Sequence, residues 1–145
     1  HMNWSAIGID LNHLSLEMII GKIFSVFAWA MGATSGSIDA VGRLIGEKLI
    51  LNECVAYLHF PDLFNGSMVN GMMTFAPEFK KSVAIATFAL AGFANLSTVA
   101  IQIGGIGELA PNQRKNLARL AIKAMICGTL TSYVSACIAG IIVSL

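Results

Sequence analysis

Apolar residues run along this chain in long segments that short clusters of charged and polar residues separate. Residues 82–107 and 124–145 contain no charged side chain. Each segment is long enough to cross the hydrocarbon core of a bilayer, which takes about 20 helical residues. No low-complexity linker divides the chain. The pattern therefore predicts one all-α domain, a polytopic membrane protein fragment.

The first apolar segment, residues 14–32, is expected to form an interfacial helix. It carries Glu17 and Lys22 near its start, and its uncharged part is short for a membrane span. Its bulky side chains favour a helix lying obliquely in the interface, with Trp29 at the depth of the lipid head groups.

The second segment, residues 37–60, is too charged for a span that faces lipid. It predicts a re-entrant helical hairpin that is buried in protein and lines a wet cavity. Gly42 and Gly46 bring two small residues to one helical face, which allows another helix to approach closely.

The third segment, residues 82–107, predicts a transmembrane helix that is interrupted. Poor helix formers gather in residues 92–98, where Asn and Ser side chains also compete for backbone hydrogen bonds. We expect the break there. We expect the helix to end at Gly104, Gly105 and Gly107.

The last segment predicts the plainest transmembrane helix. Pro111 suits the first turn of a helix, and basic residues follow it. Because positive residues favour the inner side of a membrane, this loop is expected in the cytoplasm and the C-terminus outside. The predicted location is the cell membrane, in a multi-pass protein. The basic residues are Arg114, Lys115, Arg119 and Lys123.

Composition supports a membrane setting. Hydrophobic residues make up 56% of the chain and charged residues 12%, against about 25% charged in ordinary soluble domains. The mean hydropathy is +0.74. One alternative stays open, a soluble helical interaction module whose apolar stripes pair with a partner. Without a basic face or an aromatic platform, no nucleic-acid partner is expected.

Other sequence features argue against an enzyme or a metal site. No GxSxG, Walker or HExxH motif is present. The three cysteines, Cys54, Cys127 and Cys137, lack metal spacing and predict free thiols. His1 and Met2 are interpreted as an expression scar, so the domain is residues 3–145, and the natural protein is expected to begin upstream.

Glu53 is the most informative residue. It stands in an apolar stretch, where a carboxylate is costly, and ionisable residues inside membranes are functional candidates. The alternative is that Glu53 only pairs with Lys48 or Arg43 to hold the hairpin together. Asn52 beside it can donate and accept hydrogen bonds, or it can cap the hairpin turn.

A second polar cluster lies at the predicted helix break. Asn95, Ser97 and Thr98 stand within an uncharged segment and need partners, which hydrocarbon does not supply. They either bond neighbouring helices or bind a solute, since broken helices expose backbone groups where transporters hold solutes and ions.

Two motifs resemble the concentrative nucleoside transporter family. Residues 49–57 read LILNECVAY, which resembles that family's Asn-Glu-Phe-Val-Ala-Tyr signature. Residues 91–98 read AGFANLST, and residues 101–105 read IQIGG, which resemble its second C-terminal signature. The order of the motifs and the basic loop also match, so the resemblance covers nearly the whole chain.

The resemblance implies a nucleoside symporter driven by sodium or protons. Family members are homotrimers with an elevator-like transport domain built from two repeats, each with a re-entrant hairpin and a broken helix. This chain resembles the C-terminal repeat. No cofactor is implied beyond the coupling ion, whose site is expected mainly in the missing N-terminal half, with the base contacts. The chain alone is expected not to transport.

The resemblance also implies roles for individual residues. Glu53 and Asn95 are expected to contact the ribose, and Phe93 to line the site. Thr98 stands where many members have serine, and Cys54 stands where Phe is usual, so the shape of the site is expected to differ. A transporter for another small polar metabolite remains the alternative.

Overall fold

The computed structural model describes residues 16–69 and 72–145, so the predicted scar and the start of the first segment lie outside the described residues. Helices dominate, which confirms the all-α prediction. Short 3-10 turns at Ser35–Ser37, Pro77–Phe79 and Pro111–Gln113 precede α2, α4 and α6. The helices are α1 (Leu16–Ala30), α2 (Ile38–Ile50), α3 (Glu53–Leu63), α4 (Lys80–Leu90), α5 (Leu96–Leu109) and α6 (Arg114–Ser144).

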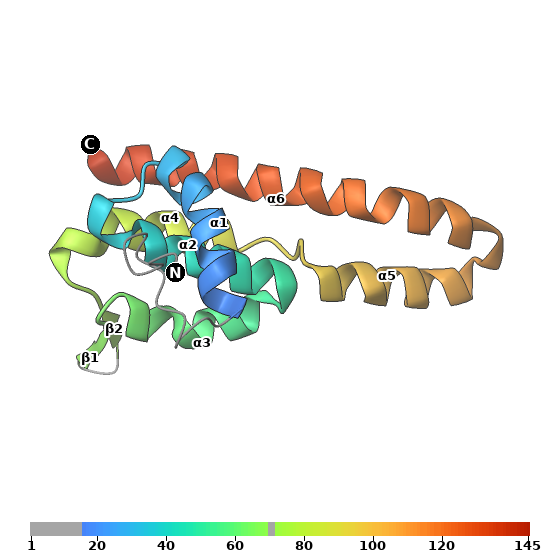
Figure 1. The fold of residues 1–145 in the computed structure, drawn as a ribbon, viewed down its shortest axis with the longest axis horizontal. Coiled ribbons are helices and arrows are strands. Elements are labelled where there is room, and N and C mark those ends of the chain that lie inside the picture. Colours follow the sequence, from blue (N-terminus) through green and yellow to red (C-terminus); the bar gives the residue numbers. More distant parts are fainter. Residues whose placement is uncertain (1–15, 70–71) are drawn as a thin grey trace, which may run out of the picture.

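The longest helix, α6, runs along the whole structure (Figure 1). Helices α1 to α4 gather beside its C-terminal half. Helix α5 runs antiparallel to its N-terminal half, and the two form a two-helix arm. Helices α4 and α5 therefore both lie along α6, one after the other, and the break between them faces the middle of α6.

The predicted hairpin is confirmed as α2 and α3. The chain leaves helical geometry at Leu51 (φ −92°, ψ −93°) and Asn52 (φ −169°, ψ 172°). Asn52 caps α3, because its side-chain oxygen accepts a hydrogen bond from the Val55 N–H at 3.0 Å.

The predicted close approach at Gly42 and Gly46 is also confirmed. A Cβ atom added to Gly42 would lie 2.6 Å from the backbone oxygen of Gly21. Only glycine therefore lets the backbones of α1 and α2 meet at this point.

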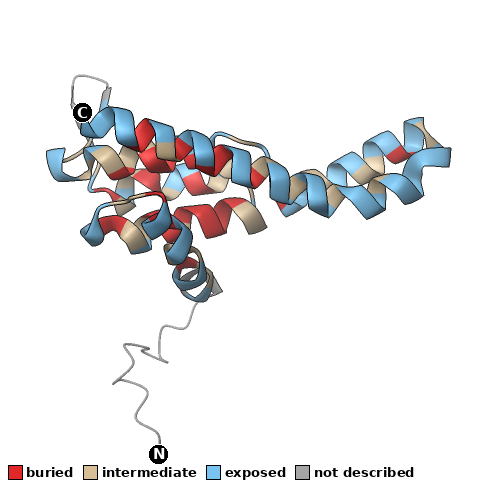
Figure 2. Cartoon of the chain, turned by 90° about the horizontal axis from the view of Figure 1, so that it is seen from above, coloured by how far each residue is buried: buried red, intermediate tan, exposed pale blue. Residues whose placement is uncertain are grey.

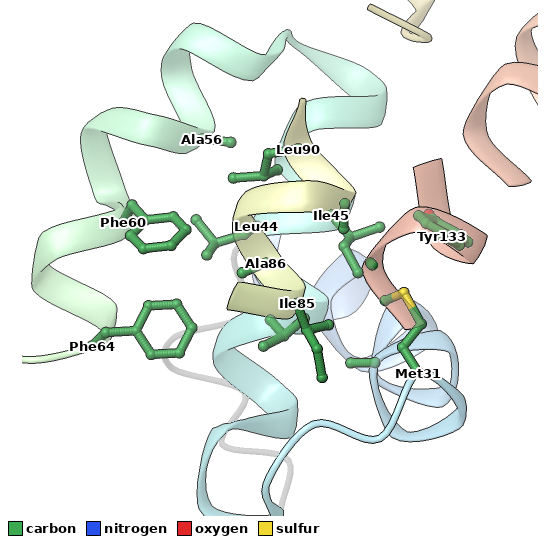
Figure 3. Close-up of a cluster of buried hydrophobic side chains, with 14 residues drawn as sticks. Met31, Leu44, Ile45, Ala56, Phe60, Phe64, Ile85, Ala86, Leu90 and Tyr133 are labelled. Atoms are coloured by element: carbon green, nitrogen blue, oxygen red, sulfur yellow. The ribbon is translucent and has the colours of Figure 1, made fainter. Parts of the chain in front are cut away.

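Buried apolar side chains from α2, α3, α4 and α6 form one core (Figure 3). Leu44 and Ile45 of α2 lie against Ile85 and Leu90 of α4, while Tyr133 closes the core from α6. This packing holds the hairpin against the first half of the broken helix.

A second, aromatic part of the core forms where α3 meets the segment between α3 and α4. The sequence offers no prediction for this segment. The rings of Phe60 and Phe64 are 5.0 Å apart, and those of Phe60 and Phe75 are 5.5 Å apart. The segment contains a two-stranded antiparallel hairpin of β1 (Ser67–Val69) and β2 (Met72–Thr74), with Met68 opposite Met73.

Most residues of the arm are exposed or partly exposed (Figure 2), and many of the exposed ones are large apolar residues. Leu109 is 88% exposed, and Ile101 is 71% exposed. Helix α6 with its preceding turn, Pro111–Ser144, is the one helix in the described residues that is long and apolar enough to cross a membrane. The apolar helices Ile19–Ala30 and Leu96–Leu109 are shorter.

Two expectations about helix ends are wrong. Gly104, Gly105 and Gly107 lie inside α5, which continues to Leu109. The helix ends because Pro111 disfavours helical geometry at Ala110, which has φ −133° and ψ 72°. The second segment was expected to end at residue 60, but α3 continues through Pro61 to Leu63.

Candidate functional site

The tip of the hairpin meets the break between α4 and α5. The side-chain Nδ2 of Asn95 donates a hydrogen bond to Oε2 of Glu53 at 3.0 Å. The two residues are 42 positions apart in the sequence. The structure thus brings together the two polar clusters that the sequence singled out, from two separate interruptions of helical structure.

Asn95 is held in place by its own helix. It precedes α5 with extended backbone angles (φ −144°, ψ 166°), and its Oδ1 accepts a hydrogen bond from the Thr98 N–H at 2.7 Å. Because the oxygen caps the helix, the nitrogen must point the other way, toward Glu53. The side chain is 1% exposed, so this orientation is fixed by its surroundings.

Glu53 is the first residue of α3, and it is half-buried. Asn52 fixes its direction by capping the helix at the preceding position. One carboxylate oxygen is used by Asn95, and Oε1 receives no hydrogen bond from the described residues. A carboxylate oxygen at a helix N-terminus is a strong acceptor for a hydroxyl group.

The alternative ion pairs for Glu53 do not form. Within the described residues, neither Lys48 nor Arg43 makes a salt bridge with it. Arg43 Nε instead lies 2.7 Å from Oε1 of Glu47, and Lys48 Nζ donates to the Ala89 carbonyl at 2.7 Å. Sequence reasoning treated Lys48 only as a partner of Glu53 and missed its bond to α4.

Two more hydrogen bonds hold the hairpin to the broken helix. The Ser97 hydroxyl donates to the Leu51 carbonyl at the hairpin tip, at 2.9 Å. The Tyr57 hydroxyl donates to the Thr87 carbonyl in α4, at 3.1 Å. Ser97 therefore takes the packing role that the sequence left open.

The other predicted residues divide between a groove and the hairpin tip. A groove of about 760 Å³ lies between α5 and α6, and Phe93, Asn95 and Thr98 line it. Phe93 is 70% exposed. Glu53 and Asn52 lie outside this groove, so Asn95 is the residue that joins both parts of the site.

Comparison with known proteins decides the family. The family described as "Na+ dependent nucleoside transporter C-terminus" matches residues 1–140. The chain belongs to this family. Its members are transporters and not enzymes, and membership confirms the resemblance to concentrative nucleoside transporters. It also argues against a soluble interaction module.

Individual relatives give the same result for this nucleoside transporter segment. It is 44% identical over 133 residues to an uncharacterised transporter of Haemophilus influenzae, covering 91% of this chain and 30% of that protein. It is 39% identical to the nucleoside permease NupC of Helicobacter pylori, covering 93% of this chain and 31% of that protein. The chain therefore spans less than a third of the length of these relatives.

A solved structure agrees with the fold. The structure of CNTnw in an inward-facing substrate-bound state is 37% identical and superposes with a TM-score of 0.79. The match covers 98% of this chain and 32% of that one. The hairpin, the broken helix and the last long helix are thus the fold of a transporter segment.

Proposed function

We propose that this chain is the C-terminal repeat of an ion-coupled nucleoside symporter that takes up nucleosides across the cell membrane. Sodium or protons drive the uptake. The observation that supports this proposal most directly is the 3.0 Å hydrogen bond between Asn95 and Glu53, which joins a re-entrant hairpin to a broken helix. Substrate sites in transporters form where discontinuous helices meet.

The donor and acceptor pattern suits a ribose. A sugar hydroxyl donates one hydrogen bond and accepts others. Oε1 of Glu53 can accept from it, and the second hydrogen on Asn95 Nδ2 can donate to it. Because a charged acceptor makes stronger hydrogen bonds than a neutral one, the Glu53 bond should be the stronger of these two contacts to the ribose.

The remaining predicted residues extend the site. Phe93 and Thr98 lie on the groove side of Asn95, where an aromatic face and a hydroxyl can contact the substrate. Oδ1 of Asn52 caps α3, so its Nδ2 can donate a hydrogen bond to the substrate. We place the base contacts and the coupling ion in the N-terminal half of the intact protein.

The proposed topology follows from the apolar surfaces. Helix α1 lies in the membrane interface, α2 and α3 form a re-entrant hairpin, α4 and α5 form a broken transmembrane helix, and α6 crosses the bilayer. The intact protein is then multi-pass and homotrimeric, with an elevator-like motion of the transport domain. Lipid covers the exposed apolar residues of the arm, such as Ile101 and Leu109.

Uridine uptake by the intact transporter in proteoliposomes tests this proposal. Glu53→Gln should lower uptake about 10-fold to 100-fold, because it removes a charge-assisted hydrogen bond of about 1.5–3 kcal/mol. Asn95→Ser should also lower uptake. Serine preserves the helix cap, but its shorter side chain has no amide group to donate to Glu53.

Glu78→Gln is the matched control, because Glu78 is an exposed carboxylate far from the hairpin tip in sequence. It should transport as the unmodified protein does. Unchanged uptake in both Glu53→Gln and Asn95→Ser, with normal membrane insertion, would refute the assignment of the site.

A further inference from the structure

Lys48 is a lysine whose whole side chain is buried. It lies two residues before the end of α2, and its relative exposure is 1%. Among the described residues, it is the largest of the fully buried side chains. Lysine is almost never fully buried unless its ammonium is paired. Groups of opposite charge or hydrogen-bond acceptors must therefore lie around the Lys48 ammonium.

The end of α4 supplies one partner for this ammonium. Nζ of Lys48 donates a hydrogen bond of 2.7 Å to the carbonyl of Ala89, and α4 ends one residue later, at Leu90. The last carbonyls of a helix lack partners within the helix and carry a partial negative charge of about half an electron. A lysine ammonium at this end offsets that charge.

Glu53 supplies a second source of negative charge. Glu53 accepts a hydrogen bond from Asn95, which follows three residues after Gly92, and Gly92 lies beside the Lys48 ammonium. The negative charge of Glu53 favours a cation at Lys48, although the two groups form no salt bridge in the described residues. One cation thus balances both the C-terminal end of α4 and the carboxylate of the proposed ribose site. Removing either charge should leave the other uncompensated in a dry environment.

The ammonium also lies beside the break itself. A Cβ atom added to Gly92 would be 3.7 Å from Nζ of Lys48. Gly92 is where the chain leaves α4 on its way to Asn95. The Lys48 ammonium, together with the Ser132 hydroxyl of α6, therefore borders the point at which the chain leaves α4.

Broken helices in transporters commonly use such C-terminal helix ends to coordinate the coupling cation. We propose that Lys48 is a tethered cation, whose ammonium takes this place at the end of α4 and so positions Asn95 against Glu53. This inference rests on the proposed function. Its consequence is that no free coupling ion binds at this break, and Lys48 acts as a positioning residue for the substrate site.

Chemical rescue tests the proposal in the intact transporter. Lys48→Ala should weaken uridine binding at least 10-fold, measured by isothermal titration calorimetry. Ethylammonium at millimolar concentration should restore most of the affinity, since it can occupy the vacated space. Lys48→Met should lose affinity without rescue, because its side chain fills that space.

Tetramethylammonium, which cannot donate a hydrogen bond to Ala89, should not rescue Lys48→Ala. The control Lys80→Ala removes an exposed lysine from the first turn of α4, the helix whose last turn Lys48 contacts, and it should bind uridine normally. A purely structural role for Lys48 would not give rescue that is selective for a primary ammonium ion.

The outcomes separate this inference from the proposed function. If the unmodified protein and Lys80→Ala bind neither uridine nor adenosine, the proposed function is wrong. If both bind and Lys48→Ala binds equally well, or loses affinity that no primary ammonium restores, the tethered cation is wrong.

A stability measurement covers the case in which Lys48→Ala does not fold. Glu53→Gln combined with Lys48→Met should lower the unfolding temperature by less than the sum of the two single losses, because each single change leaves the other charge without its balancing partner. Additive effects of the two changes would overturn the inference.

Discussion

Oε2 of Glu47 in α2 lies 2.8 Å from Nδ1 of His59 in α3. This contact links the two helices of the hairpin. The other carboxylate oxygen of Glu47 accepts from Arg43 Nε at 2.7 Å, and the carboxylate side chain is only 2% exposed. The hairpin that carries Glu53 is thus braced at a distance from its tip.

Glu47→Ala should therefore lower the stability of the intact transporter by about 1–3 kcal/mol. It removes the contact between α2 and α3 and leaves Arg43 without its acceptor. The loss of stability stays modest because the Arg43 and His59 side chains are 41% and 44% exposed and partly screened by solvent. The apparent unfolding temperature in detergent measures it. His59→Ala should have the smaller effect, and equal stability of Glu47→Ala and the unmodified protein would refute the brace.

Asn52 is predicted to have two separable roles. Asn52→Ala should cost about 1 kcal/mol of stability, because the cap on α3 is lost. Asn52→Ser keeps a capping oxygen and should remain as stable as the unmodified protein. It should nevertheless bind uridine several-fold more weakly, since the side-chain amide nitrogen is gone. Normal uridine affinity in Asn52→Ser would show that Asn52 only caps the helix.

Gly42 sets the contact between α1 and α2. Gly42→Ala should destabilise the protein by about 1–3 kcal/mol, because its new Cβ would meet the backbone of Gly21 at 2.6 Å, and backbone cannot rotate away. Gly36→Ala is the matched control, since a Cβ there meets nothing within 4 Å. Thermal unfolding of both variants should show a loss only at Gly42. Equal unfolding temperatures would contradict the close packing.

Much of this architecture was predictable because polar residues in an apolar chain have few acceptable environments. The segment around Glu53 predicted a hairpin tip, and the residues around Asn95 predicted a helix break. Both are present, and the break is shorter than expected, since α5 already begins at Leu96. Ser97 and Thr98 lie in its first turn.

Local preference was misleading where tertiary packing or a neighbouring proline decides the outcome. Glycine costs about 1 kcal/mol in a helix, yet α5 passes through Gly104 and Gly105 and stops only before Pro111. In hydrocarbon, a helix that stopped early would leave backbone groups without partners. Lys48 shows the same limit, because its acceptor on Ala89 is 41 residues away in sequence.

The orientation of α6 is predicted by the basic residues at its start. In a cysteine-free background, Asn116→Cys should react with a membrane-impermeant maleimide only after the cells are permeabilised, because the basic end faces the cytoplasm. Leu145→Cys should react from outside. Both positions are exposed in the structure. Labelling of Asn116→Cys in intact cells would reverse the proposed topology.

In the proposed site, Glu53 and Asn95 together recognise the hydroxyl groups of a ribose. The most direct measurement compares the binding of uridine and 2′,3′-dideoxyuridine to the intact transporter and to its Glu53→Gln variant, by calorimetry. The unmodified protein should prefer uridine by about 10-fold to 100-fold, since a site built to bond hydroxyls rejects ligands that lack them. Glu53→Gln should lose most of that preference, whereas an undiminished preference in this variant would show that Glu53 does not bind the ribose hydroxyls.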